Sequence, residues 1–367
     1  MVSVLEKTQK IMMKGAHLND LITHLTRAHC SNIDSKNTLV TLAARHHVLP
    51  LLAKKTQQPN ISRATQLQNL QQLAQLKHIV TELDKNDLSF FVLKGLPLAQ
   101  QLYGDIGLRP SSDIDLLIRP SDFEQVHRLF IHLGFQAIRP SKKICHGFFL
   151  WQKDMTYAHP KHPIKIDLHW RLDRNPSWNQ IDFEALWQQH EIVTLSGVRI
   201  PVLGKQDNLL YLSQHGAKHG WSTLKWLQDI VDFCEVYTID WSTLWQQAKR
   251  QHVTRPLLQA LTLIERLYDK PLPFTPNLSK REQQRLTKLT DHAVRYLTAT
   301  NKFTGTHLHR IRYHWQLCGY WRYKLDSYRV ICWRHAAWWQ KKCLPTWAFG
   351  CVYMAEPVIL LLQLIRR

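Results

Sequence analysis

The chain has 367 residues, of which 44% are hydrophobic, and its formal net charge is +20. The apolar content excludes a disordered chain, and the length allows two or three compact units with cores of their own. Seven cysteines without a Cys-x-x-Cys spacing argue against a structural zinc site or a disulfide framework and favour a reducing cytoplasm. The positive charge favours polyanionic partners such as RNA, nucleotides or anionic lipid surfaces.

Residues 1–88 are predicted to form a helical N-terminal region that packs on the domain after it. The longest helix is expected over residues 64–84, and Asn86-Asp87 is its expected end. Leucine and isoleucine recur there near helical spacing, which indicates an apolar face. That face consists of Leu67, Leu70, Leu73, Leu76, Ile79 and Leu83.

Residues 89–203 alternate strand and helix patterns and are predicted to form the catalytic core. Residues 89–93 read as a short buried strand, which Lys94-Gly95 interrupts before a helix that begins near Pro97. A helix start has unpaired N–H groups that favour anions, phosphate above all, and Lys94 would add a full positive charge. The alternative is an ordinary strand-to-helix turn with a solvated lysine.

Asp113 and Asp115 stand in an apolar strand, Asp-Ile-Asp-Leu-Leu-Ile. Residues two apart in a strand point to the same face, so the two carboxylates are expected to project together while Ile114 enters the core. Paired carboxylates in apolar surroundings repel each other unless a cation lies between them. Two Mg²⁺ ions shared by such oxygens suit phosphoryl or nucleotidyl transfer. The alternative is a strand end with two solvated aspartates.

Asp167 lies in the middle of a second strand, Ile-Lys-Ile-Asp-Leu-His-Trp, and shares a face with His169. Asp167 is a candidate third carboxylate that helps to activate an attacking hydroxyl. His169 is a candidate substrate contact or a group that orders Asp167, with a partly buried histidine of no chemical role as the alternative.

These motifs resemble the nucleotidyltransferase superfamily whose best-known member is DNA polymerase β. Within it, the chain looks most like a group of uncharacterised bacterial nucleotidyltransferases. The resemblance is carried by the turn Leu93-Lys94-Gly95, by Arg109 shortly before the acid pair, and by the strand Asp167-Leu168-His169-Trp170. A leucine, Leu96, stands where the wider superfamily usually has a serine that binds phosphate.

The resemblance implies a role for each matching residue. Asp113, Asp115 and Asp167 would be the catalytic residues and would bind two Mg²⁺ ions. Lys94, Gly95 and Arg109 would bind the nucleoside triphosphate, with Arg109 bracing the loop before the acid strand as its alternative.

The resemblance also places a helix with a histidine and a lysine, and then an aspartate, after the core. His215, Lys218 and Asp229 are therefore candidate substrate contacts, with a polar network that braces two helices as the alternative.

Residues 204–300 are predicted to form a helical domain, and residues 301–367 a basic, Trp-rich C-terminal region. In this last region many Lys and Arg residues are opposed by only Asp326 and Glu356. Basic residues interleaved with tryptophans suit nucleic acid and a membrane interface equally well. Residues 344–365 are apolar but interrupted by charge and proline, which favours an interfacial or docked helix over a spanning one.

We therefore expect an α+β protein with a small mixed-sheet nucleotidyltransferase core, a helical N-terminal lead-in and a helical C-terminal region. Its reaction would be Mg²⁺-dependent transfer of a nucleoside monophosphate from an NTP to a small molecule, sugar phosphate or peptide, in the cytoplasm and with possible membrane association. One alternative is a toxin-like transferase directed at RNA or tRNA. The other is an inactive module that acts at a membrane surface or in a protein interaction.

Overall fold

A computed structural model describes residues 17–26, 38–138, 149, 152–299 and 307–335 of the chain. The apolar stretch at 344–365 lies outside these residues. Within them, no helix is both long and apolar enough to cross a bilayer. The expected α+β class is confirmed: a mixed sheet lies between a helical lead-in and a helical C-terminal part.

Helices precede the sheet, as the sequence predicts. Residues 17–26 are helical, and they are followed by α2 (Thr38–Arg45), α3 (Leu49–Lys55), the 3₁₀ helix η1 (Pro59–Ser62) and the long α4 (Arg63–Lys85). The turn after α2 also holds a distant helix in place. His46 Nδ1 accepts the N–H of Leu224, and the His46 carbonyl accepts the N–H of Lys225.

Five strands form the central sheet in the order β1-β2-β5-β4-β3. The strand β2 runs parallel to β5, and all other neighbours are antiparallel. The elements of this region are β1 (Phe90–Val92), α5 (Leu96–Tyr103), η2 (Ile106–Leu108), β2 (Asp113–Ile118), η3 (Pro120–Asp122), α6 (Phe123–His132), β3 (Gln136–Ile138), β4 (Asp154–His159) and β5 (His162–His169).

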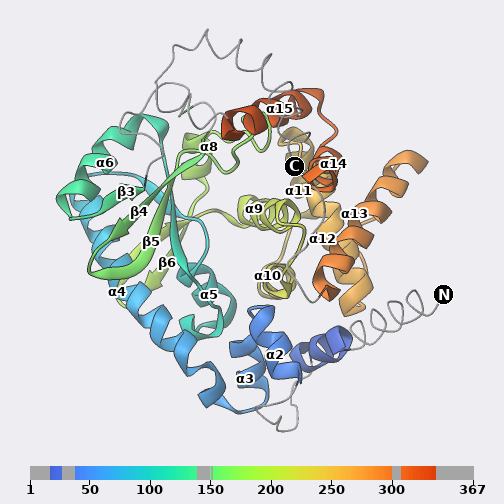
Figure 1. Ribbon diagram of the computed structural model, residues 1–367, viewed down its shortest axis with the longest axis horizontal. Helices are drawn as coiled ribbons and strands as arrows, with labels where there is room; N and C mark the ends of the chain where they lie inside the picture. Colours follow the sequence, from blue (N-terminus) through green and yellow to red (C-terminus); the bar gives the residue numbers. More distant parts are fainter. Residues whose placement is uncertain (1–16, 27–37, 139–148, 150–151, 300–306, 336–367) are drawn as a thin grey trace, which may run out of the picture.

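One face of the sheet is apolar and is covered by α4 and α6 (Figure 1). Ile114, Leu116, Ile166 and Leu168 are buried there, because alternate residues of β2 and β5 point to that side. A separate hairpin of β6 (Glu191–Leu195) and β7 (Val198–Val202) packs beside β1 and extends the same core. The opposite face of the sheet, which carries the polar residues of β2 and β5, is turned toward the C-terminal helices (Figure 1).

The predicted leucine face of α4 is only partly correct. Leu76, Ile79 and Leu83 are buried, but Leu67 is 60% and Leu70 56% exposed. The buried side of this half of the helix carries amides instead, because backbone carbonyls of the loop before β2 need donors. These amides are Asn69, which donates to the carbonyls of Ile106 and Arg109, and Gln72, which donates to the carbonyl of Asp113.

The C-terminal part is a set of packed helices that begins beside β7 and reaches back to the lead-in. Its members are α8 (Phe183–Gln188), which precedes the hairpin, and then α9 (Lys205–Lys218), α10 (Leu224–Val236), α11 (Trp241–Arg250), α12 (Thr254–Tyr268), α13 (Lys280–Thr298), α14 (His307–Leu317) and α15 (Trp321–His335). Figure 1 shows α9 and α10 at the centre of the molecule, between the sheet and α12 and α13. A single hydrophobic cluster joins these helices to Leu18 and Leu21 at one end of the chain and to Tyr313 and Tyr323 at the other.

Side-chain hydrogen bonds attach α14 and α15 to the rest of the protein. Tyr313 Oη donates to the carbonyl of Ala217 at 2.8 Å. Asn175 Nδ2 donates to the carbonyl of Tyr323 and to Ser327 Oγ, each at 2.8 Å. The described start of the basic C-terminal region is therefore packed against the segment that follows β5.

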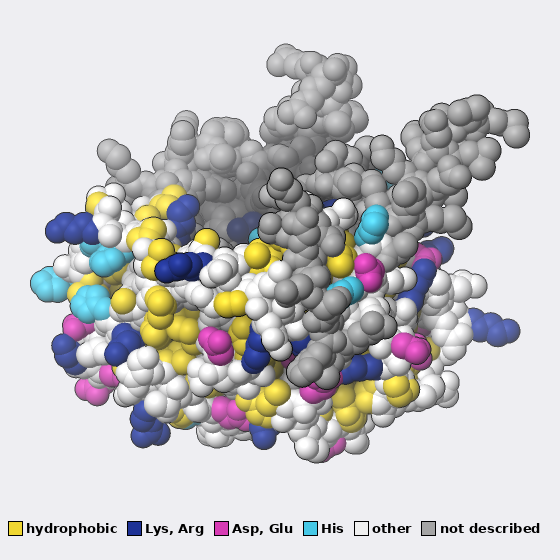
Figure 2. Space-filling view, turned by 90° about the horizontal axis from the view of Figure 1, so that it is seen from below, with side chains coloured by type: hydrophobic (Ala, Val, Ile, Leu, Met, Phe, Trp, Pro, Cys, Tyr) yellow, Lys and Arg dark blue, Asp and Glu magenta, His cyan; other side chains and the backbone are white. Residues whose placement is uncertain are grey.

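The described surface seen from below Figure 1 does not form one continuous basic area (Figure 2). Lys and Arg side chains are interspersed there with Asp and Glu. A nucleic-acid groove needs neighbouring cations that follow a phosphate backbone. This face therefore gives no support to the expected RNA partner, despite the overall charge of the chain.

Candidate active site

Asp115 and Asp167 lie opposite each other in the parallel pair β2–β5. The same register pairs Asp113 with Lys165 and Leu117 with His169, so all three aspartates and His169 belong to the polar face of the sheet. The period-two prediction for both strands is thereby confirmed in the structure. The groups that surround the acids come from other elements.

Lys94 directly contacts the acid pair. Its ammonium forms an ion pair with Asp115 Oδ2 and lies 3.5 Å from Asp113 Oδ1, and its side chain is only 13% exposed. Burial alone would disfavour the charged lysine, but the two carboxylates outweigh this effect and raise the pKa of Lys94. The sequence alternative of a solvated lysine does not describe this side chain.

Gly95 gives the backbone the turn that places Lys94 at the acids. Its φ of 77° lies in the left-handed region, which glycine adopts without strain. A Cβ at this position would lie 3.1 Å from Ser111 Oγ, in the loop that precedes Asp113. The helix α5 begins at the next residue, with Pro97 in its first turn, as expected.

The two acids of β2 differ in their surroundings. Asp115 is buried, with a side chain 6% exposed, whereas that of Asp113 is 35% exposed. Burial of Asp115 opposes ionisation, but Lys94 and a hydrogen bond from His169 outweigh it and hold the pKa of Asp115 well below its usual range. Asp115 is thus an ionised, fixed carboxylate, and Asp113 is the more accessible one.

His169 is held between Asp115 and Lys153. Its Nε2 lies 3.0 Å from Asp115 Oδ1, and its Nδ1 lies 3.0 Å from Lys153 Nζ. An ammonium has donors but no acceptor, so Nδ1 must be the accepting nitrogen and Nε2 must carry the proton. His169 therefore donates to Asp115. The sequence suggested Asp167 as the acid that His169 orders, whereas in the structure its Nε2–H is directed to Asp115.

Asp167 is positioned by Thr156 on the neighbouring strand β4. Thr156 Oγ1 donates to Asp167 Oδ1 at 2.6 Å, across the register pair that joins these residues. Burial raises the pKa of Asp167, and the nearby charge of Asp115 acts in the same direction. Asp167 therefore gains a proton more readily than Asp115, whose pKa is lowered.

Helix α9 presents polar and aromatic groups toward the acids. Burial and the neighbouring charges of His219 and Lys94 lower the pKa of His215 well below its usual value, so His215 is a neutral imidazole. Lys218 Nζ lies 3.1 Å from Asp173 Oδ2, beside the segment after β5. Tyr211 on the same helix lies close enough to Asp115 for that carboxylate to raise the pKa of its phenol, after the larger effect of burial.

Arg109 and Asp229 form a buried pair of their own. Arg109 Nε and Nη2 donate to the two oxygens of Asp229 at 2.8 and 2.9 Å, and the side chains are 3% and 1% exposed. From the sequence, Arg109 is a candidate nucleotide contact and Asp229 a candidate substrate contact, and each has a bracing role as its alternative. With all of its charge engaged in this pair, Arg109 fixes the loop before β2 to α10, which corresponds to the bracing alternative.

Several groups around the acids carry no motif that sequence reasoning could have used. Lys153 directly precedes β4, Thr156 lies on β4, and Lys225 comes from the start of α10. Lys225 Nζ donates to the carbonyl of Pro110 at 3.2 Å, and burial, followed by the charge of Arg109, lowers its pKa to about 7.

The comparison with known families decides what this arrangement belongs to. Residues 32–269 match the model of a family described as uncharacterised nucleotidyltransferases. The chain belongs to this family. It is accordingly a transferase, and its match covers the sheet, both acid strands and the helices α9 and α10.

Other comparisons add little to the family assignment of this nucleotidyltransferase. The solved structure of an antigenic nucleotidyltransferase-like protein from Paracoccidioides brasiliensis is similar at 14% identity. The similarity covers 54% of this chain and 88% of that one, with a TM-score of 0.38, which is too remote to support an argument. No curated protein matches the chain.

The acids of the nucleotidyltransferase form a donor set that suits a hard divalent cation. One ligand atom each of Asp115, Asp167 and His169 lies within 4.8 Å of the others. Carboxylate oxygens are the ligands Mg²⁺ prefers, whereas His169 uses its Nε2 proton on Asp115 in this structure. The residues present therefore fit a metal held by aspartates, with His169 behind them.

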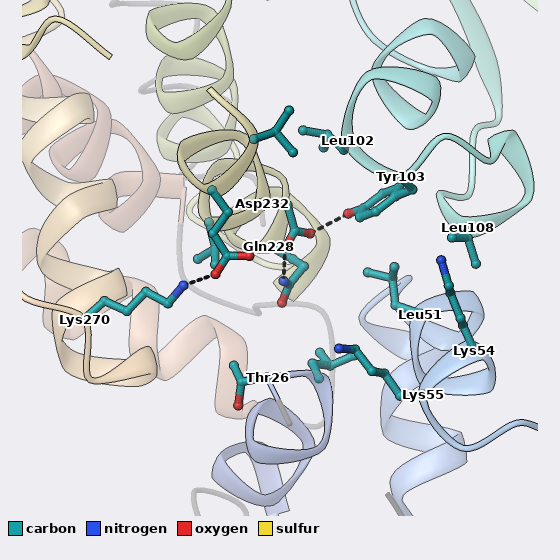
Figure 3. Close-up of a pocket in the computed structure, with 14 residues that line it drawn as sticks. Thr26, Leu51, Lys54, Lys55, Leu102, Tyr103, Leu108, Gln228, Asp232 and Lys270 are labelled. Atoms are coloured by element: carbon teal, nitrogen blue, oxygen red, sulfur yellow. Dashed lines mark hydrogen bonds and ion pairs between the residues drawn. The ribbon is translucent and has the colours of Figure 1, made fainter. Parts of the chain in front are cut away.

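A separate cavity of about 320 Å³ lies between α10 and the helical lead-in (Figure 3). Leu51, Lys55 and Leu108 line it from one side, and Gln228 and Asp232 of α10 from the other. Tyr103 Oη donates to Asp232 Oδ2 at 2.6 Å. None of the three aspartates of the sheet lines this cavity, so it is distinct from the acid site.

Proposed function

We propose that this nucleotidyltransferase moves a nucleoside monophosphate from an NTP to the hydroxyl or phosphate of an acceptor, with release of pyrophosphate. The observation that carries the proposal is the register of β2 and β5, which puts Asp115 beside Asp167 and leaves Asp113 on the same face. Two bound Mg²⁺ ions would supply charge stabilisation for the attacking and leaving oxygens.

The residues divide this work by their surroundings. Asp113 and Asp115 would hold the metal ions that carry the triphosphate, and His169 fixes the Asp115 carboxylate through its Nε2–H. Asp167, whose pKa is raised by burial, would take the proton of the attacking hydroxyl. The Gly95 turn and the start of α5 would face the phosphates with backbone N–H groups.

The acceptor would approach from helix α9. Lys218 and Lys153 are close enough that the charge of Lys218 contributes to lowering the pKa of Lys153, after the effect of burial. Lys153 forms an ion pair with Asp154, and Lys218 forms one with Asp173. An acceptor that carries negative charge, such as a phosphorylated or carboxylated small molecule, would compete with these carboxylates for the two ammonium groups. This acceptor class agrees better with the mixed charges of Figure 2 than an RNA does.

The experiment that tests the proposal is a calorimetric titration of the purified protein with each of the four NTPs, with and without Mg²⁺. We expect one or more triphosphates to bind only with the metal, and Asp113→Asn to lose that binding while the protein stays folded by circular dichroism. Asp105→Asn, at the other end of the same loop, is the matched control. Equal binding by Asp113→Asn and the wild type would overturn the proposal.

A further inference from the structure

Lys94 stands where the acid pair needs a positive charge. Within the described residues, its ammonium is the lysine group that contacts both aspartates of β2. Each carboxylate directs one oxygen toward this ammonium: Oδ2 of Asp115 and Oδ1 of Asp113. Lys94 therefore acts in this structure as the counter-ion of the pair.

Both oxygens of Asp115 are engaged in this structure. Asp115 Oδ1 lies 3.0 Å from His169 Nε2, and Asp115 Oδ2 forms the ion pair with Lys94. A divalent ion binds carboxylate oxygens at about 2.0–2.1 Å for Mg²⁺, closer than a hydrogen bond. An ion that bridges Asp113 and Asp115 would therefore lie beside the Lys94 ammonium at Asp115, and two cations at one place repel each other.

The position of Lys94 in the chain gives its ammonium a second destination. It immediately precedes Gly95 and the start of α5, where a triphosphate would lie in the proposed function. A side chain that leaves the acids at this point can reach phosphate oxygens without any change in the fold. Its loss from the acids would then be compensated by a new ionic partner.

We propose that Lys94 is an internal counter-ion that a divalent cation displaces from Asp113 and Asp115 and that the phosphates of the nucleotide then accept. This inference rests on the proposed function and adds the order in which the metal and the nucleotide engage Lys94 and the acids. Metal and nucleotide bind cooperatively, because each removes a cost that the other would meet alone. Thermodynamic linkage makes the coupling reciprocal, commonly within a range of about 5- to 150-fold.

The test measures Mn²⁺ binding by electron paramagnetic resonance, with and without the α,β-methylene analogue of the triphosphate that binds in the titration above. For the wild type we expect weak binding of Mn²⁺ alone and at least about fivefold tighter binding with the analogue. For Lys94→Met we expect Mn²⁺ alone to bind about tenfold tighter than in the wild type, and the coupling to the nucleotide to disappear. These results together would support the displacement.

Lys225→Met is the matched control, because Lys225 is a neighbouring buried lysine that contacts a carbonyl rather than the acids. An equal gain in Mn²⁺ affinity in this control would assign the effect to the general field and overturn the inference. If Lys94→Met does not fold, Lys94→Gln keeps a hydrogen-bond donor while removing the charge and is expected to behave alike.

Failure of the inference and failure of the proposed function give different results. If the wild type binds Mn²⁺ with the analogue but the Lys94 variants bind Mn²⁺ alone no more tightly than the wild type, the displacement is wrong and the function stands. If the wild type binds no Mn²⁺ in either condition, the proposed function is wrong and the inference fails with it.

Discussion

Gln72 Nε2 on helix α4 donates to the carbonyl oxygen of Asp113 at 2.6 Å and to Ser111 Oγ at 3.0 Å. A helix outside the sheet thus fixes the backbone from which the first acid projects. The position of the acid strand depends on an amide in a stretch of sequence that contains no recognisable motif.

Gln72→Met is expected to destabilise the protein by about 1 kcal/mol, because it removes the shorter of two side-chain hydrogen bonds to the Asp113 carbonyl and leaves only the one from Ser111 Oγ at 3.2 Å. It should also weaken Mg²⁺-dependent NTP binding, since the loop before β2 is released. Urea unfolding and calorimetry measure the two effects. Leu70→Gln, on the exposed side of the same helix, is the control and should change stability by less than about 0.5 kcal/mol. An unchanged NTP affinity in a destabilised Gln72→Met would contradict the positioning role.

Arg109→Met should cost about 3–5 kcal/mol of stability, because it leaves the Asp229 carboxylate buried without its partner. The double variant Arg109→Met with Asp229→Leu should recover most of that loss. Chemical denaturation gives the stability of each variant, and the double variant separates the two roles of Arg109. A bracing residue predicts a stable double variant that binds Mg²⁺-NTP normally. A stable double variant that has lost NTP binding would instead make Arg109 a nucleotide contact.

The pH dependence of stability should reveal the titration of Asp232, which lines the cavity and accepts a hydrogen bond from Tyr103. Burial raises the pKa of Asp232 to about 6, whereas an unfolded chain titrates this group near 3.9. The native state therefore holds the proton more tightly, and the stabilisation present at low pH is lost as the pH rises from about 4 through 6. We expect Asp232→Asn to gain about 1–2 kcal/mol relative to the wild type between pH 4.5 and 7.5, after allowance for partial exposure.

Urea unfolding at the two pH values measures this change. Any hydrogen bond that the amide fails to make lowers the free energy of unfolding equally at both pH values, so it cancels in the difference. Glu265→Gln, an exposed carboxyl on α12, controls for the loss of a negative charge. A parallel course for wild type and Asp232→Asn would show that the Asp232 carboxyl titrates normally in the fold.

The tautomer of His169 is open to direct measurement by ¹⁵N NMR of the imidazole. The wild type should show the proton on Nε2, because Lys153 donates to Nδ1. In Lys153→Met the proton should stay on Nε2, because the Asp115 carboxylate can only accept, but the ring loses the donor at Nδ1 that holds it in place. Metal-dependent NTP binding should therefore weaken as His169 holds Asp115 less firmly. Lys161→Met, an exposed lysine in the β4–β5 turn, should leave both readouts unchanged. A proton on Nδ1 in the wild type would show that His169 does not orient Asp115.

Patterns that repeat within a few residues predicted most of the sheet and the shared face of the acids. The period of two in β2 and β5 is local, and the apolar alternates left only one face for the carboxylates. The resemblance of the motifs led to the family. Lys153, Tyr211 and Lys225 could not be predicted, because three separate segments bring them to the acids or to the loop before β2, and none shows a repeating pattern.

The misassigned half of α4 has a different physical cause. Leucine spacing predicted its buried face, but backbone carbonyls in the neighbouring loop compete for that face, and amides satisfy them where leucines cannot. Hydrophobic periodicity measures only the apolar part of burial. It fails where a helix packs on a loop rather than on a sheet.

The family match ends at residue 269, but Asn175 within it donates hydrogen bonds to Tyr323 and Ser327 beyond it. The unit that folds cooperatively is therefore longer than the part of the chain that matches the family. A shortened chain that stops at residue 269, or before residue 301, would strip buried partners from the segment directly after the catalytic strand. Loss of activity on removing the basic region would therefore say nothing about nucleic acid or lipid. Its surface roles are better separated by changing the exposed side chains Trp321 and Arg322 in the intact protein.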